Sequence, residues 1–139
     1  FQHVFPTVSR DGRWLAYSSD ESGRWEVYVT DFPESRRKWQ VSVEGAAFPL
    51  WRRDGRELAF AELPGSLAVA EVDGSGETFV VDEVETLFGE LPVQQGPLLY
   101  DMTGDGERFL ILAPVTGPEG EDLPPMTLVV NWTSERRER

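Results

Sequence analysis

The stretch FPTVSRDGRWLAY (residues 5–17) decides the fold, because a close copy, FPLWRRDGRELAF, follows at residues 48–60. The two segments share Phe-Pro at the start, Arg-Asp-Gly-Arg in the middle and Leu-Ala before the last aromatic residue. A weaker copy, YDMTGDGERFLIL, occupies residues 100–112. Repeats of about 40–50 residues are typical of propeller blades or solenoid units. The chain is therefore expected to consist of recurring modules.

Each module has the pattern of an antiparallel meander. The Asp-Gly pair tolerates the positive backbone torsions that a tight turn requires, and strand-forming residues follow it. WLAYSS is followed by WEVYVTDF (25–32) and KWQVSV (38–43); ELAFAE is followed by SLAVAEV (66–72) and TFVVDEV (78–84). The pattern predicts four strands per module. Only VDEVETLFGEL (81–91) carries helical periodicity, and a short helical turn there is an alternative.

The strands after the Asp-Gly turns are apolar almost without interruption, as in LAYSS and LAFAE. A strand with one solvent-exposed face would alternate between apolar and polar residues, whereas a strand buried on both faces need not alternate. We therefore predict an all-β fold: a partial β-propeller of about three four-stranded antiparallel blades, the last incomplete. The blades are expected at 3–43, 46–84 and 97–132, within a single domain 1–139 that ends in a polar tail (133–139).

These residues resemble the WD-like repeat of TolB-type β-propellers. The first module carries the resemblance through its turn, the strand after it and Glu26-Val27-Tyr28-Val29, and the second module through Pro49, Trp51 and Asp54-Gly55-Arg56. The third module matches only around Asp105-Gly106. The segment MTLVVNW (126–132) is similar to the end of propellers attached to certain bacterial membrane-anchored Ser/Thr kinases.

The resemblance implies a scaffold rather than a chemistry, because this repeat supports many functions. Related propellers occur in the Tol–Pal system and in the gating domain of prolyl-oligopeptidase-type enzymes. The resemblance suggests an extracytoplasmic or periplasmic location in the parent family. The chain has neither the kinase signatures nor a Gly-x-Ser-x-Gly elbow, so no catalytic residue is carried over from it.

Three blades do not close a ring, since propellers have about four to eight. An open arc would expose an apolar blade face at each end. One solution is a two-fold dimer in which the third blade of each chain meets the first blade of the other, which gives a six-bladed ring. The alternative is a monomeric arc whose sheets curl into a sandwich or a barrel-like fold.

Composition argues against several kinds of partner. The formal net charge of −12 disfavours nucleic acid, and no apolar run approaches the roughly 18 residues of a membrane helix. The chain has no cysteine and a single histidine, His3, so we expect no transition-metal site and no cofactor. Because the chain begins with Phe rather than Met, we expect a processed chain or an excised piece.

Candidate binding residues are aromatic. Five tryptophans lie on or beside expected strands, where packing between blades is their ordinary role. Trp39, beside the basic Arg36-Arg37-Lys38, and Trp51, on an expected innermost strand, are the two chosen for a possible binding surface. The acidic, proline-rich PVTGPEGEDLPP (114–125) is expected to be an exposed hairpin loop.

The first functional hypothesis is a non-enzymatic scaffold that binds a protein or a peptide through loops and strand edges. The alternative is a gating or sensory propeller fragment of a larger hydrolase or kinase whose catalytic domain lies elsewhere. A hydrolase that acts through carboxylates in its loops is the third and weakest hypothesis.

Overall fold

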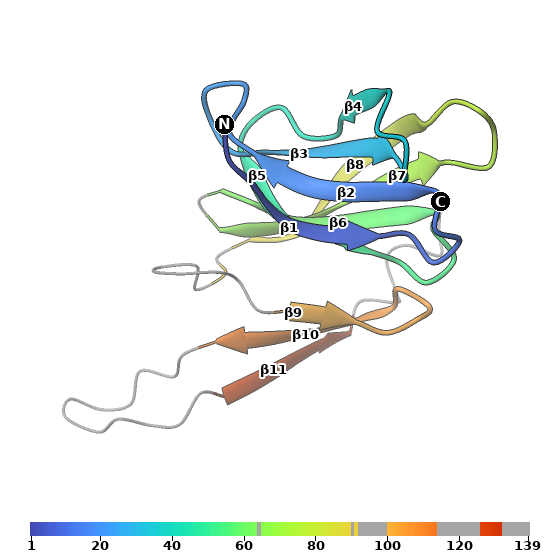
Figure 1. The fold of residues 1–139 in the computed structure, drawn as a ribbon. Helices are drawn as coiled ribbons and strands as arrows, with labels where there is room; N and C mark the ends of the chain where they lie inside the picture. Colours follow the sequence, from blue (N-terminus) through green and yellow to red (C-terminus); the bar gives the residue numbers. More distant parts are fainter. Residues whose placement is uncertain (64, 90, 92–99, 114–125, 132–139) are drawn as a thin grey trace.

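The computed structural model describes residues 1–63, 65–89, 91, 100–113 and 126–131, and these form strands, turns and loops. The strands make three antiparallel sheets in chain order (Figure 1): blade 1 (β1–β4), blade 2 (β5–β8) and blade 3 (β9–β11). Their bounds are β1 (His3–Val8), β2 (Trp14–Ser19), β3 (Glu26–Asp31), β4 (Lys38–Gln40), β5 (Ala46–Trp51), β6 (Glu57–Glu62), β7 (Ser66–Asp73), β8 (Val80–Phe88), β9 (Tyr100–Met102), β10 (Arg108–Ala113) and β11 (Met126–Asn131). Within these ranges there is no helix that could cross a bilayer.

The Asp-Gly pairs form the turns between the first two strands of each blade, as the sequence predicts. Gly12, Gly55 and Gly106 adopt φ values of 74°, 74° and 70°. The glycine N–H donates to the carbonyl three residues earlier, and the aspartate side chain accepts the N–H two residues after itself. Only the glycine takes the left-handed conformation, which is the geometry of a type I turn that ends in a glycine bulge.

An unusual backbone feature also repeats. Phe5 and Phe48 both have positive φ, 54° and 61°, and each lies where the register of its hairpin shifts. Left-handed conformations are uncommon for bulky residues. Their rings contact each other at a centroid distance of 4.5 Å. Two modules 43 residues apart therefore share a bulge as well as a turn, which supports their origin by duplication.

The first strands of the three blades are linked side by side. The indole Nε1 of Trp51 in β5 donates to the carbonyl oxygen of Thr7 in β1 at 3.0 Å. The hydroxyl of Tyr100 in β9 donates to the carbonyl oxygen of Phe48 in β5 at 2.6 Å. The strand order of each sheet leaves these first strands at one edge. Neighbouring edge strands of successive sheets are the arrangement of innermost propeller strands.

Blade 2 is buried on both faces, as its continuous apolar strands predict. Leu58 and Phe60 belong to the core shared with blade 1, whereas Ala59 and Ala61 belong to the cores shared with blade 3. Successive residues of a strand point to opposite faces, so one short run fills both interfaces. From the other side, Phe109 and Ile111 of blade 3 pack against blade 2 and are at most 1% exposed.

The all-β prediction is confirmed for the described residues, with sheets of four, four and three strands. The helical turn considered for 81–91 is wrong, because β8 pairs with β7 over most of that range. Between Val81 and Val84 two residues of β8 face only one of β7, and this bulge breaks the alternation of apolar residues. The resulting spacing resembles that of a helix. The expected loop 114–125, Trp132 and the tail 133–139 lie outside the described residues.

Candidate binding cleft at the Asp-Gly end

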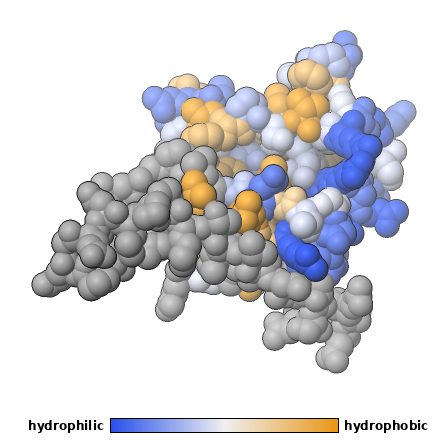
Figure 2. Space-filling view, turned by 90° about the horizontal axis from the view of Figure 1, so that it is seen from below, coloured by the Kyte–Doolittle hydropathy of each residue, from blue (hydrophilic) through white to orange (hydrophobic). Residues whose placement is uncertain are grey.

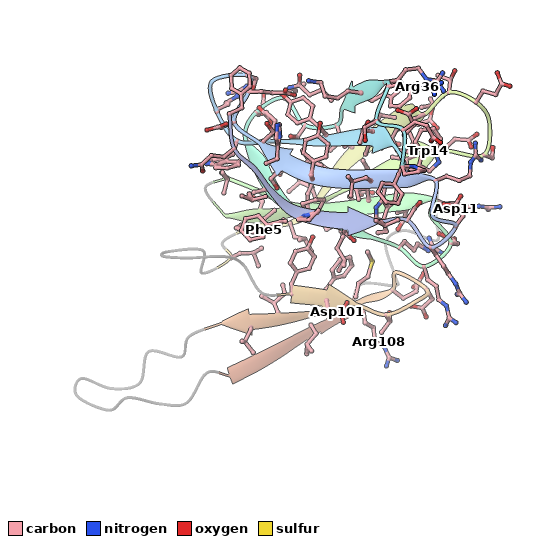
Figure 3. All side chains as sticks on the ribbon, in the orientation of Figure 1. Phe5, Asp11, Trp14, Arg36, Asp101 and Arg108 are labelled. Carbon is pink, nitrogen blue, oxygen red and sulfur yellow. The ribbon has the colours of Figure 1, made fainter. Side chains whose placement is uncertain are left out.

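The turns that contain the Asp-Gly pairs lie at one end of the three sheets, together with the loops 32–37 and 74–79. We call this the Asp-Gly end; Asp11, Trp14 and Arg36 are labelled there in Figure 3. A cleft of about 660 Å³ opens at this end, between the turns of blades 1 and 2 and the end of β7. We call it the Asp-Gly cleft. In the view from below, hydrophilic residues gather on the right, which is the side of the Asp-Gly end (Figure 2).

The Asp-Gly cleft is lined mainly by charged side chains, with an excess of acids. Two arginines, Arg52 and Arg56, face six carboxylate residues. Such an excess of like charge in a partly enclosed cleft attracts cations and disfavours anions. The six acidic residues are Asp11, Asp54, Glu57, Glu71, Asp73 and Asp82.

One wall of the cleft is held by Arg13, which reaches from blade 1 to blade 2. Its guanidinium donates to the carbonyl oxygens of Gly74 at 3.0 Å, Ser75 at 3.3 Å and Gly76 at 2.7 Å. The planar fork of five N–H donors suits an arginine to several acceptors at once. Arg37 adds a hydrogen bond of 2.6 Å to the carbonyl oxygen of Glu77. Consecutive carbonyls of one loop are thus fixed to the neighbouring blade.

The aspartates at the cleft are stabilised as carboxylates. Burial alone would raise the pKa of Asp11, but hydrogen bonds from the Ser9 hydroxyl and the Arg13 N–H outweigh it, so the pKa is lowered on balance. The hydroxyl and the N–H of Ser75 lower the pKa of Asp73. Hydrogen bonds to the ionised form favour it. Both side chains therefore carry negative charge at neutral pH.

Arg52 offsets part of this charge inside the cleft. Its Nη1 lies 3.4 Å from Glu57 Oε1 and its Nε lies 3.4 Å from Asp54 Oδ2. The second pair lacks hydrogen-bond geometry, because the buried Nε has no hydrogen-bond acceptor among the described residues. Glu71 and Asp82 form no such pair with Arg52, and both side chains are exposed. The other exposed acids of the cleft already accept hydrogen bonds or pair with Arg52, whereas the carboxylates of Glu71 and Asp82 are open to a ligand.

The structure places Trp39 and Trp51 in the packing between blades 1 and 2. Trp51 is 8% exposed, and its ring meets Phe79 edge-on at 6.0 Å. Trp39 is partly buried, lies 5.9 Å from the same Phe79, and has the Arg37 guanidinium 5.4 Å from its ring centre. The phenylalanine thus brings the two tryptophans together. Their role in a binding surface stays a prediction.

Trp14, which the sequence did not single out for binding, is the tryptophan that lines the cleft. Its Nε1 donates to the carbonyl oxygen of Gly74 at 3.0 Å, and its ring contacts Trp39 at 5.5 Å. Its position directly after Asp-Gly-Arg was the available signal, since a turn places the next side chain at the sheet end. His3 lies on the opposite face of blade 1, edge-on to Tyr17. The described residues contain no group of three or more side chains arranged to hold a metal ion.

Known proteins share the fold of this chain at low sequence identity. No protein-family model and no curated protein sequence matches it. The crystal structure of TolB from Acinetobacter baumannii matches 96% of the chain with a TM-score of 0.64 and 18% identity. A putative TolB from Agrobacterium tumefaciens matches 63% with a TM-score of 0.48 and 21% identity. The matches span 30% and 33% of those two proteins, respectively. In its stacked antiparallel sheets and in its similarity to TolB, this chain has the fold of TolB-like β-propeller blades.

Proposed function

We propose that the chain is a non-enzymatic module that binds a protein or peptide partner, and that the Asp-Gly cleft receives a basic segment of that partner. The observation that supports this most is the cleft itself, whose acidic walls come from two blades. The hydrogen bonds of Arg13 fix its loop before any ligand arrives. Preorganised walls reduce the entropy lost on binding.

The chemistry of the lining supports a basic ligand over an acidic one. Lysine and arginine side chains of a peptide can reach Glu71 and Asp82, which are exposed, while the peptide backbone lies along the mouth of the cleft. Attraction between such charges is weakened by salt, because the Debye length shortens. Affinity is therefore expected to fall as ionic strength rises.

Fluorescence anisotropy with two labelled peptides of equal length, one rich in lysine and one rich in glutamate, tests this function. The basic peptide is expected to bind and the acidic one not. Glu71→Gln with Asp82→Asn is expected to weaken binding about tenfold, as the loss of two partly exposed charge pairs implies. Glu44→Gln, an exposed acid in the β4–β5 loop at the other end, serves as the matched control. Equal binding of both peptides, or no effect of the cleft variants, would exclude the cleft as the site.

A second function is favoured because the match spans only 30% of the TolB structure. In this alternative the chain is part of a larger propeller that gates or senses for a hydrolase or kinase domain. The full reading frame distinguishes the two, since the alternative requires an adjoining catalytic domain. The isolated chain would then bind the two peptides equally poorly.

We further propose that two copies of the chain close a six-bladed ring. Blade 1 and blade 3 each have one face without a neighbouring sheet among the described residues, and apolar side chains are exposed on blade 3. Covering such faces is the main driving force for association. Sedimentation velocity of the 139-residue chain tests the assembly, and a monomer at high micromolar concentration would contradict it.

A further inference from the structure

The two internal contacts between blades join equivalent faces, so the faces left open can be identified position by position. In β6, Leu58 and Phe60 pack against the preceding blade; in β10, Phe109 and Ile111 do the same. We call this the leading face of a blade. The repeat aligns Leu58 and Phe60 with Leu15 and Tyr17 of blade 1.

The leading face of blade 1 has no sheet against it among the described residues. An open hollow of about 530 Å³ lies there, with Leu15 and Tyr17 on its apolar floor. Its rim is basic and includes Arg36. The leading face of blade 2, in contrast, is filled by blade 1.

On the opposite, trailing face, the second strand contributes small residues to the contact with the following blade: Ala16 in blade 1, and Ala59 and Ala61 in blade 2. The repeat aligns Ala59 and Ala61 with Leu110 and Leu112 of blade 3. These leucines are 42% and 40% exposed. The open trailing face therefore presents bulky apolar side chains, and the open leading face presents a hollow.

From these two faces we infer that the trailing face of blade 3 docks on the leading face of blade 1 of a second copy, with Glu107 opposite Arg36. This inference rests on the dimer proposed above and specifies its contact. Leu110 and Leu112 enter the hollow over Leu15 and Tyr17. The contact continues the internal stacking, leading face on trailing face, and it occurs twice in the ring.

Charge complementarity at the Asp-Gly end specifies the contact further. At the blade 1–blade 2 contact, Arg13 donates to the loop after β7, which runs from Gly74 to Phe79. In blade 3 the residue after Asp-Gly is Glu107, which has no N–H to donate from its side chain. The loop that it would face in blade 1 is FPESRR (32–37), of the same length as 74–79 and also preceded by an aspartate. The positions that correspond to the three carbonyls bound by Arg13 are Phe32, Pro33 and Glu34. The donors that Glu107 lacks come from the end of the loop, where Arg36 borders the hollow.

Both charged groups are available for such a contact. Neither the Arg36 guanidinium nor the Glu107 carboxylate forms a hydrogen bond or ion pair with another described side chain, and Arg36 borders the hollow. Figure 3 shows Arg36 on blade 1 and Arg108 on blade 3 at the same end of the molecule. The neighbouring residues are complementary as well, because Glu34 of the loop can meet Arg108. The residue after Asp-Gly is thus an arginine in blades 1 and 2 and an acid only in blade 3, which is the blade that would meet the basic loop of the second copy.

Two charge reversals test the contact on the whole chain. Alone, Glu107→Arg places like charges at both contacts of the ring, and so does Arg36→Glu. Each is expected to raise the dimer dissociation constant about tenfold or more in sedimentation velocity. An equimolar mixture of the two variants is expected to recover the wild-type constant, because a heterodimer has opposite charges at both contacts. The double variant is expected to dimerise like the wild type for the same reason.

The control is Glu44→Arg, an exposed charge reversal at the other end, which is expected to leave the dimer unchanged. Circular dichroism of each variant checks that the sheets have formed. A wild-type chain that stays monomeric overturns the dimer itself. A dimer that the reversals do not weaken, or that the mixture does not restore, overturns only the Glu107–Arg36 contact and leaves the ring standing.

Discussion

The indole Nε1 of Trp14 lies 3.0 Å from the carbonyl oxygen of Gly74, 60 residues further along the chain. The approach is so close that a Cβ at position 74 would lie 2.3 Å from the same nitrogen. The indole of Trp14 therefore leaves no room for a side chain at position 74. This requirement for glycine is steric and does not depend on a left-handed backbone, since its φ is not in that region.

Gly74→Ala is expected to cost about 3 kcal/mol of unfolding free energy, from overpacking and a weakened hydrogen bond. Gly12→Ala is the matched comparison, because a Cβ there meets nothing within 4 Å and only the φ of 74° is unfavourable. That change is expected to cost about 1 kcal/mol. Urea denaturation measures both, and a smaller effect at position 74 than at 12 would contradict the steric argument.

The hydrogen bonds of Arg13 predict a difference between two arginines that the repeat makes equivalent. Arg13→Ala removes donors from three carbonyls of the loop and is expected to destabilise the chain by about 1–2 kcal/mol. Arg56 forms no side-chain hydrogen bond with the described residues, so Arg56→Ala is expected to change stability by less than about 0.5 kcal/mol. If urea denaturation gave equal losses of unfolding free energy for the two variants, Arg13 would stabilise the chain through its positive charge and not through these hydrogen bonds.

Much of this architecture could be predicted from the sequence, and the reason is local. The Asp-Gly turns, the strands that follow them and the burial of LAFAE on both faces depend on residues near one another in the chain. Turn chemistry and hydrophobic pattern encode such features directly. The strand bounds differ mainly at β4, which ends at Gln40 rather than at 43, and at β8, which runs from Val80 to Phe88 rather than from 78 to 84.

The cleft could not be predicted in the same way. Arg13 recognises backbone carbonyls of residues 74–76, and a carbonyl is present at every position, so the sequence carries no sign of the acceptor. The sequence favours Trp51 for a binding surface and assigns Trp14 to packing between blades, yet of the two it is Trp14 that lines the cleft. Which buried aromatic residue reaches an opening depends on how two sheets stack, and local pattern does not specify that.

Phe79 is predicted to be the most sensitive position between blades 1 and 2. It is 2% exposed and contacts the rings of Trp14, Trp39 and Trp51 at centroid distances of 5.1, 5.9 and 6.0 Å. Phe79→Ala is expected to cost about 3–5 kcal/mol and to shift native tryptophan emission to longer wavelength, because water enters among the indoles. Phe79→Leu keeps most of the volume and is expected to cost about 1 kcal/mol. An unshifted emission in the alanine variant would contradict this packing.

The stability of the fold is predicted to depend on the negative charge of the buried Glu26 carboxylate, and not only on the size and shape of this side chain. It is 0% exposed and accepts hydrogen bonds from the Ser42 hydroxyl, the Gly45 N–H and the Arg24 guanidinium. Glu26→Gln replaces one acceptor oxygen with an NH₂ that faces these donors, and the expected cost is about 2–3 kcal/mol. Glu44→Gln, an exposed change of the same kind, is expected to stay within about 0.5 kcal/mol. Similar unfolding curves for both variants would mean that the charge of Glu26 contributes nothing.

Tyr17 predicts a loss of stability in strong alkali. Burial, with the nearby Glu21 carboxylate and Tyr28, raises its pKa from 10.0 to about 12. The folded state therefore favours the neutral phenol. The contribution is complete below pH 10, where both states are protonated, and is lost as the pH rises from 10 to about 12. Tyr17→Phe is expected to flatten this part of the stability curve, and titration by tyrosinate absorbance should show one late-ionising group fewer.

The hydrogen bonds donated by indoles cross the contact between the first two blades in both directions, from Trp14 to Gly74 and from Trp51 to Thr7. A pulling force applied to either sheet is therefore transmitted to the other through two anchors, one in each direction. Under mechanical load the pair is expected to rupture in a single step rather than as two separate sheets.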